Sequence, residues 1–489
     1  MGWTRRGMMA GLLAGAAAPL WAEAPATSLL PRRRGQATPA ARDTQAVDRL
    51  IAEARLQGAT VGFALADATT GEMLESGAAD QPLPPASVMK ALTAAYALNR
   101  LGPAHRFTTQ VLATAPMQGG RVDGDLVLVG GGDPTLDTDR LGDLVARLAA
   151  TGLRQVSGRL LYWDAALPRL DRIDAEQPEF VGYNPALGGL NLNFNRVHFE
   201  WRQAGGADWA LTMDARAERF VPPVRMARMR VERRTLPLFT YEGDSQGDRW
   251  TVASEALGKG GARWLPVRHP GLYAAEVFRT LAAAQGIDLP EPQSVAALPT
   301  GQVLASDASD SLDVILRDML KHSTNITAEV AGLSASGAAG LPASAQAMQN
   351  WLLAQHGISA RIADHSGLGG VSRISAGQMV RLLQGEQGGL LPHLMKDHPL
   401  TDAKGNAVEG HPVQVRAKTG TLNFVSTLAG YILLPGGRRL VFAIFAADPD
   451  RRARLSPQER EAPEGGKSWA KRARRLQGQL LTRWAGLYA

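Results

Sequence analysis

The spacing of apolar residues along the chain predicts a mixture of helices and strands. Leu141 opens a run with apolar side chains at i, i+3, i+4 and i+7, the spacing of one helix face, with Asp137 or Thr138 as cap and Gly152 as stop. The same reasoning predicts helices over residues 47–57, 88–101, 273–284, 311–320, 345–353 and 468–487.

The last predicted helix is amphipathic. Arginines gather on one face, and the apolar face is made of Trp469, Ala473, Leu476, Leu480, Trp484 and Leu487. We interpret it as a helix packed on a sheet, and a helix lying on a membrane surface is the alternative.

Short apolar runs bounded by turn residues predict strands. Residues 61–66 lead through a turn at 68–71 into an expected hairpin, and residues 427–434 and 440–446 form another around a Pro-Gly-Gly-Arg turn. Further strands are expected at 107–113, 121–129, 159–163 and 413–417. The stretch 168–261 predicts a small all-β insertion of short strands and turns.

Composition narrows the class of protein. The 489 residues suffice for two or three domains, and 45% hydrophobic with 20% charged residues is ordinary for a soluble globular chain. The net charge of +7 fits attraction to an anionic wall polymer or no specific partner, and the scattered basic residues predict no nucleic-acid binding. The absence of cysteine excludes disulfides and thiolate catalysis, and the nine histidines show no metal-binding spacing, so we expect no metal.

The N-terminus has the pattern of an export signal. Arg5 and Arg6 precede an uncharged stretch that is too short to span a membrane, and a small-x-small cleavage pattern ends at Ala24. We therefore expect a signal peptide over 1–24, of the twin-arginine or the general secretory type, and a flexible leader over 25–42. The mature protein is predicted to work outside the cytoplasm, in the periplasm of a bacterium, with at most peripheral membrane contact.

The first candidate catalytic residues along the chain are Ser87 and Lys90. Ser87 and Lys90 lie three residues apart at the start of a predicted helix, so their side chains share one face. A serine hydroxyl is a weak nucleophile until a base accepts its proton, and a partly desolvated lysine can be that base. The pair alone is a weak signal, because Ser-x-x-Lys is common on solvated helices.

Two further stretches make the signal specific. Ser323 and Asn325 follow a predicted helix, and Lys418-Thr419-Gly420 ends a predicted strand, where the glycine permits close approach of a substrate. Together with Ser87-x-x-Lys90 they form, in order, the joint signature of class A β-lactamases and penicillin-binding proteins.

The chain resembles the type-4, class C low-molecular-mass penicillin-binding proteins, which are D-alanyl-D-alanine carboxypeptidases/endopeptidases. Besides the three motifs, the resemblance rests on the large insertion after the first motif and on stretches that begin at Phe107, Gly124, Gly132, Asn191, Asp364, Lys418 and Leu428. It covers nearly the whole mature chain.

The resemblance implies an α+β fold: a penicillin-binding transpeptidase-like catalytic domain with an antiparallel sheet flanked by helices, plus a helical subdomain. This domain would be split into 43–102 and 300–489 by a large, mostly β insertion. The insertion would comprise an α/β domain over 103–167 and 262–299 and a nested β-rich domain over 168–261.

The resemblance also implies the role of each residue in an acyl-serine route. Ser87 would attack the carbonyl between two D-alanines with Lys90 as base, and Asn325 would orient Lys90 and the substrate amide. Ser323 and Lys418 would relay a proton to the leaving amine, and Lys418 and Thr419 would bind the terminal carboxylate of the substrate. Gly420 would let the backbone approach the substrate closely. The N–H groups of Ser87 and Thr421 would form the oxyanion hole. The partners would be peptidoglycan stem peptides and, as covalent inhibitors, β-lactams; no cofactor is required, and whether the chain forms a homodimer stays open.

The sequence departs from the family pattern in three places. Thr324 stands where the family has Asp. The family's Ser-Arg, expected directly after Leu368, is displaced to Ser372-Arg373, and the loop before Lys418 lacks the family's usual Gly-Thr-Leu and arginine. The last two border the cleft, so they bear on peptide preference more than on the reaction.

Other motifs compete with this interpretation. A nucleophile elbow at 243–247 lacks the flanking strand and helix, and the triple glycine at 130–132 lacks the lysine of a phosphate cradle. Asp364-His365-Ser366 cannot form a triad on adjacent residues. A true β-lactamase and a wall-binding scaffold without turnover remain as alternative functions, and the scaffold alternative would show a broken motif, which this chain does not.

Overall fold

The computed structural model describes residues 44–205, 208–402, 405–456 and 459–489. The predicted signal peptide and leader lie outside these residues. Residues 46–489 form one compact unit. No helix in the described part of the chain is long and apolar enough to cross a membrane.

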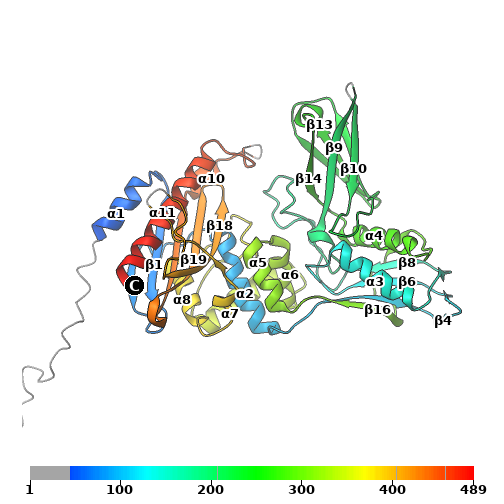
Figure 1. The fold of residues 1–489 in the computed structure, drawn as a ribbon, viewed down its shortest axis with the longest axis horizontal. Coiled ribbons are helices and arrows are strands. Elements are labelled where there is room, and N and C mark those ends of the chain that lie inside the picture. The colour runs from blue at the N-terminus through cyan, green and yellow to red at the C-terminus, as the bar shows by residue number, and fades with distance from the viewer. Residues whose placement is uncertain (1–43, 206–207, 403–404, 457–458) are drawn as a thin grey trace, which may run out of the picture. The chain divides into compact units, whose positions relative to one another are not determined.

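An antiparallel sheet combines strands from residues 60–77 and 396–447, which are far apart in the chain (Figure 1). Its six strands, in spatial order, are β17 (Lys396–Asp397), β18 (Gln414–Leu422), β19 (Val425–Leu433), β20 (Arg439–Ala447), β1 (Thr60–Asp67) and β2 (Met73–Gly77). Both predicted hairpins are confirmed, as β1 with β2 and β19 with β20. The pairing of β1 with β20 brings the segment before Ser87 beside the C-terminal hairpin.

Both faces of this sheet are covered, which explains the nearly continuous apolar runs in its strands. Along β20, Phe442 and Ile444 pack into a core with Trp469 and Trp484 of α11 (Gly466–Tyr488), whereas Val441 and Phe445 pack into a core with α8 (Ala376–Gly385). The final helix therefore packs on the sheet, as predicted.

Two details of the predicted helices are wrong. Leu487 was placed on the apolar face but is 56% exposed, because it lies in the last turn. The first helix, α1 (Thr44–Glu53), ends before Gln57 because Arg55 takes a left-handed φ of 50°.

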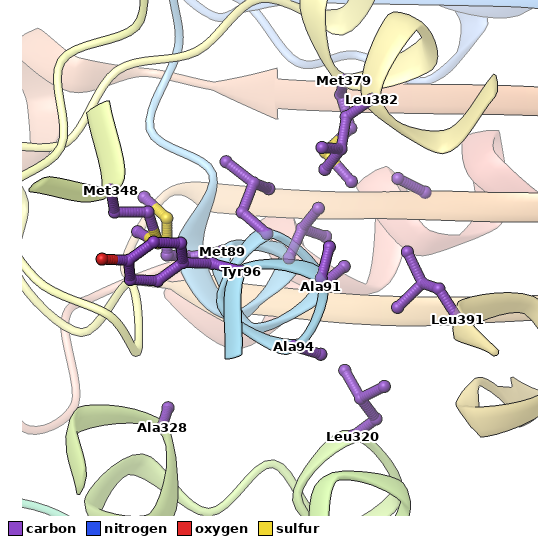
Figure 2. Close-up of a cluster of buried hydrophobic side chains, with 14 of the residues drawn as sticks. Met89, Ala91, Ala94, Tyr96, Leu320, Ala328, Met348, Met379, Leu382 and Leu391 are labelled. Atoms are coloured by element: carbon purple, nitrogen blue, oxygen red, sulfur yellow. The ribbon is translucent and has the colours of Figure 1, made fainter. Parts of the chain in front are cut away.

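A helical layer packs around the Ser87 helix. A short 3-10 turn, η1 (Ala86–Val88), leads into α2 (Met89–Leu101), whose alanine-rich residues 89–97 are all buried. Figure 2 shows α2 inside a cluster to which Leu320, Ala328, Met348 and Leu382 contribute from surrounding helices. These helices are α5 (Leu312–His322), α6 (Asn325–Ser336), α7 (Leu341–His356), α8 and α9 (Leu391–Leu394).

Most of the chain between α2 and α5 builds further sheets. A five-stranded sheet has the order β15 (Pro292–Ser294), β8 (Leu160–Trp163), β6 (Leu126–Gly130), β3 (Thr108–Ala113) and β16 (Gln302–Ala308), with α3 (Thr138–Ala150) and α4 (Pro270–Ala284) packed in the same core. The N-cap of α3 is Asp137, whose side chain accepts from the Arg140 N–H. The strand predicted over 121–129 is interrupted, since only β5 (Arg121–Val122) and β6 are regular and the Asp-Gly-Asp between them turns the chain.

The predicted β-rich stretch contains two three-stranded sheets. Their strands are β9 (Arg196–Gly205), β10 (Asp208–Asp214), β11 (Ala227–Glu232), β12 (Phe239–Asp244), β13 (Gly247–Ala253) and β14 (Gly260–Pro266). Before this stretch in the chain, a small sheet joins β4 (Met117–Gln118), β5 and β7 (Gln155–Val156). The elbow-like motif at 243–247 is the turn between β12 and β13, as expected. The domain boundaries stay a prediction.

A glycine sets how closely α6 approaches the loop at residues 364–368. A Cβ on Gly332 would lie 2.1 Å from Cγ of the fully buried His365. We expect Gly332→Ala to lower the free energy of unfolding by about 2–3 kcal/mol through overpacking, measured by urea denaturation. Gly486→Ala, on α11 with open space around its Cβ, is the matched control and should be neutral or stabilising by up to about 1 kcal/mol. An unchanged midpoint for Gly332→Ala would contradict this packing.

Candidate active site

Ser87 and Lys90 lie against each other at the start of α2. Lys90 Nζ is 3.0 Å from Ser87 Oγ, as the three-residue spacing predicts. Lys90 is fully buried, whereas Ser87 is half-buried and lines a cleft of about 1100 Å³. A buried amine beside a solvent-reachable hydroxyl is the arrangement that proton transfer from serine to lysine requires.

The first residue of α6 completes the surroundings of Lys90. Lys90 Nζ donates to Asn325 Oδ1 at 2.7 Å and to the Ser366 carbonyl at 2.8 Å. The Asn325 amide nitrogen donates to the Tyr183 carbonyl at 2.9 Å. Because a carboxamide nitrogen has two hydrogens, Asn325 retains one for another acceptor in the cleft.

A second lysine–serine pair joins the other two motifs, and of this pair Ser323 lines the cleft whereas Lys418 is buried and is not among the lining residues. Lys418 Nζ on β18 donates to Ser323 Oγ at 3.0 Å and to the Thr419 carbonyl at 2.6 Å. Ser323 takes a left-handed φ of 60° at the end of α5, which turns the chain into α6. Thr324 forms no side-chain cap, so the contacts in this motif come from its two neighbours, as expected.

The strand β18 approaches η1 closely at Gly420. A Cβ there would lie 2.2 Å from Thr427 Oγ1 and 2.9 Å from the Ser87 nitrogen, so only glycine fits. Thr427 Oγ1 also donates to the Pro85 carbonyl at 2.7 Å. Ser87 and Thr421 line the same cleft, which places the two predicted oxyanion residues together.

Burial and neighbouring charge set the protonation of both lysines. Burial lowers the pKa of Lys90 to about 7, and the positive charge of Lys418 acts in the same direction, while the carboxylates of Glu329 and Asp364 oppose it. Burial, with a smaller contribution from Lys396, lowers the pKa of Lys418 to about 8. Near neutral pH, Lys90 is therefore partly neutral and Lys418 mostly charged.

Two buried carboxylates beside Lys90 were not predicted from the sequence. Glu329 accepts the N–H groups of His365 and Ser366 at 3.0 and 2.9 Å, which fixes the carbonyl that Lys90 contacts. Asp364 accepts the N–H groups of Gly367 and Gly369. Burial, with repulsion from Asp364, raises the pKa of Glu329 to about 7. The signal for Glu329 was available: it is an acid on an apolar helix, one turn after Asn325.

The adjacent Asp364-His365-Ser366 is not a triad, as the sequence indicated. His365 Nε2 lies 2.7 Å from Ser344 Oγ, and burial lowers the pKa of His365 to about 3. Both His365 and Ser344 are fully buried, and neither lines the cleft, so this pair is part of the core and not of the site.

Comparison with known proteins decides the family. Residues 43–462 match the model of the D-Ala-D-Ala carboxypeptidase 3 (S13) family. The chain belongs to this family. It is a serine peptidase of the D-Ala-D-Ala carboxypeptidase type, which confirms the resemblance.

Individual relatives agree with this assignment. The chain is similar to the D-alanyl-D-alanine carboxypeptidase of Actinomadura sp. (strain R39), with 29% identity over 473 residues and 86% of each chain covered. It is 24% identical over 414 residues to the D-alanyl-D-alanine carboxypeptidase DacB of Haemophilus influenzae, covering 80% of this chain and 85% of that one. The crystal structure of penicillin-binding protein 4 from Haemophilus influenzae superposes with a TM-score of 0.71 at 21% identity, over 89% of this chain and 99% of that one. This likeness confirms the predicted α+β fold.

The displaced Ser-Arg of this S13 chain has a local role. Ser372 Oγ lies 3.3 Å from Asp364 Oδ1, and Arg373 donates to the carbonyls of Gly370 and Ser372 within its own loop. Arg373 is not among the residues lining the cleft, whereas Arg452 is.

Proposed function

We propose that Ser87 is the nucleophile of a D-alanyl-D-alanine carboxypeptidase/endopeptidase that cleaves peptidoglycan stem peptides and cross-links through an acyl-serine intermediate. The observation that carries the proposal is the contact of 3.0 Å between Ser87 Oγ and a fully buried lysine amine. This proposal rests on the site's geometry together with the family.

Acylation follows from the positions of the two lysines. Neutral Lys90 accepts the Ser87 proton as Oγ bonds to the carbonyl carbon between the two D-alanines. The developing oxyanion receives hydrogen bonds from the N–H groups of Ser87 and Thr421. As the C–N bond breaks, Ser323 passes a proton from Lys418 to the leaving amine, because Ser323 Oγ lies within hydrogen-bond distance of Lys418 Nζ. Water then hydrolyses the ester.

The leaving residue ends in a carboxylate, and β18 offers ligands for it. Lys418 and Thr419 bind this carboxylate, and Asn325 holds Lys90 in place through its oxygen. A β-lactam presents the same carbonyl and carboxylate, so it acylates Ser87, and its ester is hydrolysed slowly. One relative's crystal structure, that of Haemophilus influenzae penicillin-binding protein 4, is a complex with a β-lactam, which supports this part of the proposal.

The proposed substrate also suggests where in the cell the enzyme acts. Peptidoglycan lies outside the cytoplasmic membrane, so we place the enzyme in the periplasm, exported by the N-terminal segment. Fusing residues 1–42 to a reporter that is active only after export would test this placement.

The pH dependence of D-alanine release tests the function and the base together. Lys90 must be neutral to accept a proton, so kcat/KM for an N-acylated peptide ending in D-Ala-D-Ala should rise with pH through about 7. Lys418 must be charged to bind carboxylate, so activity should fall above about pH 8. Because Glu329 raises the pKa of Lys90, Glu329→Gln should move the acidic limb to lower pH. Absence of D-alanine release would overturn the proposed function, and an acidic limb unmoved by Glu329→Gln would contradict the assignment of that limb to Lys90.

A further inference from the structure

The cleft that contains Ser87 is basic along one wall. Ser87, Ser323, Asn325 and Thr421 lie at its catalytic end, and the wall is built from α10 (Pro449–Ala453), residues 460–463 and the start of α11. Among the described residues, the basic ones lining it are Arg452, Arg460, Lys467, Lys471 and Arg474, against one acidic residue, Glu461.

Of these five basic side chains, only Arg460 is paired with groups in the described part of the protein, and four are available to a ligand. Arg460 donates to the Glu176 carbonyl at 3.0 Å and lies 3.5 Å from its carboxylate, and Glu461 lies 3.7 Å from Arg263. Within the described residues, the side chains of the other four have no ion pair and no hydrogen bond. We call these four, Arg452, Lys467, Lys471 and Arg474, the basic wall.

Arg452 is the least exposed member of the basic wall, so water solvates its charge less than that of the other three. It is only partly exposed, and burial lowers the pKa of its guanidinium, with Asp174 and Glu176 opposing the shift. Its Nε would lie 3.3 Å from a Cβ on Gly370, so the glycines inserted after Leu368 leave the space that it occupies. Among the described residues no carboxylate lies within ion-pair distance of this partly desolvated guanidinium, which favours binding an anion from solution.

The other three members lie on one helix face. Lys467, Lys471 and Arg474 stand at i, i+4 and i+7 of α11, and all three are exposed. The N-terminal end of α11, where N–H groups add partial positive charge, lines the same cleft at residues 465–468. Charge from two elements therefore converges on one space.

The direction of the substrate leads to this wall. The carboxyl end of the peptide is held at Lys418 and Thr419, and Ser87 attacks the residue before it. The upstream residues then follow β18 toward Leu422 and Asn423, and the Asn423 amide donates to the Arg460 carbonyl at 2.6 Å. The upstream part of the peptide thus enters the space beside the basic wall.

We propose that the basic wall binds free carboxylates of the stem peptide upstream of D-Ala-D-Ala, so that the enzyme selects acidic stem peptides over amidated ones. The inference rests on the proposed function, because it takes the peptide's direction from the acylation geometry. Stem peptides carry such carboxylates on their second and third residues when these are a γ-linked D-glutamate and a dicarboxylic diamino acid. Conversion to carboxamides removes the charge with little change of shape.

A binding measurement tests the selection without relying on turnover. The probes are L-Ala-γ-D-Glu-diaminopimelyl-D-Ala-D-Ala with both upstream carboxylates free and the same peptide with both as carboxamides, titrated calorimetrically into full-length Ser87→Ala. We expect the acidic peptide to bind about tenfold more tightly, the scale of one charge-assisted contact. The preference should shrink between about 0.05 and 0.5 M NaCl, because salt screens exposed charges.

Variants assign the preference to the wall. Arg452→Gln should weaken binding of the acidic peptide several-fold and leave the amidated peptide within twofold, and Lys471→Glu combined with Arg474→Glu should abolish the preference. Arg454→Gln is the charge-matched control, since Arg454 is exposed and does not line the cleft. Equal affinity for the two peptides, or equal weakening of both by Arg452→Gln, would overturn the proposal. Failure of the proposed function has a different signature, namely wild-type protein that releases no D-alanine from either peptide whatever its affinities.

Discussion

Ser87→Ala is expected to abolish release of D-alanine from a D-Ala-D-Ala peptide, with a loss of about 10⁵-fold or to below detection. Ser87 is the hydroxyl that contacts Lys90 Nζ, and Ser323, the other motif serine, contacts Lys418 instead. Without Oγ no ester forms, and the remaining cleft only binds the peptide. The measurement is kcat/KM by a coupled assay for free D-alanine.

Folding should be unaffected by this change. Ser87 is half-buried, and loss of its hydroxyl leaves Lys90 with two other acceptors, Asn325 Oδ1 and the Ser366 carbonyl. Ser306→Ala, at an exposed position on β16, is the matched control and should retain full activity. Substantial D-alanine release by Ser87→Ala would show that another nucleophile does the chemistry.

Lys90→Gln is expected to slow acylation of Ser87 by about 10³-fold, the usual cost of removing a general base. Glutamine keeps a donor near the Asn325 oxygen but has no basic nitrogen at neutral pH. The second-order rate constant for acylation by a fluorescent penicillin measures the effect. Peptide binding should change little, because Lys90 is fully buried and its amine contacts Ser87, Asn325 and the Ser366 carbonyl.

The control for Lys90→Gln is a variant that also removes one lysine charge, but far from the site. Lys321→Gln removes one lysine from an exposed position on α5 and should acylate at the wild-type rate. Thermal unfolding of Lys90→Gln shows whether the buried carboxylates Glu329 and Asp364 tolerate loss of the cation. A folded Lys90→Gln protein that acylates at the wild-type rate would remove Lys90 from the mechanism.

Much of the fold could be predicted because its signals are local. The strands β19 and β20 are apolar runs around a glycine-rich turn, and α3 combines a periodic apolar face with an aspartate cap. The helix α8 was not predicted, although its capping box, Ser375 with Gln378, is readable in the sequence. The exposure of Leu487 was missed because the apolar spacing continues into the last turn of α11, where the side chain is no longer covered.

The site was predictable to the extent that its residues belong to motifs. Ser87, Ser323 and Lys418 were named from spacing and order, and the structure brings them into one site. Arg452 could not be found this way, because its position depends on contact between α10 and the loop at Gly370, 82 residues earlier in the chain. The carbonyl of Tyr183 beside Asn325 is similar, since backbone groups leave no signal in composition.

The mass of the intact protein after brief incubation with benzylpenicillin tests the central claim most directly. The account predicts that the wild-type protein gains one penicilloyl group, that the adduct persists for hours and maps to the peptide containing Ser87, and that Ser87→Ala gains nothing. An equal adduct on Ser87→Ala, or an adduct on another residue, would contradict the assignment of the nucleophile. Rapid hydrolysis of the drug with no lasting adduct would instead indicate a β-lactamase.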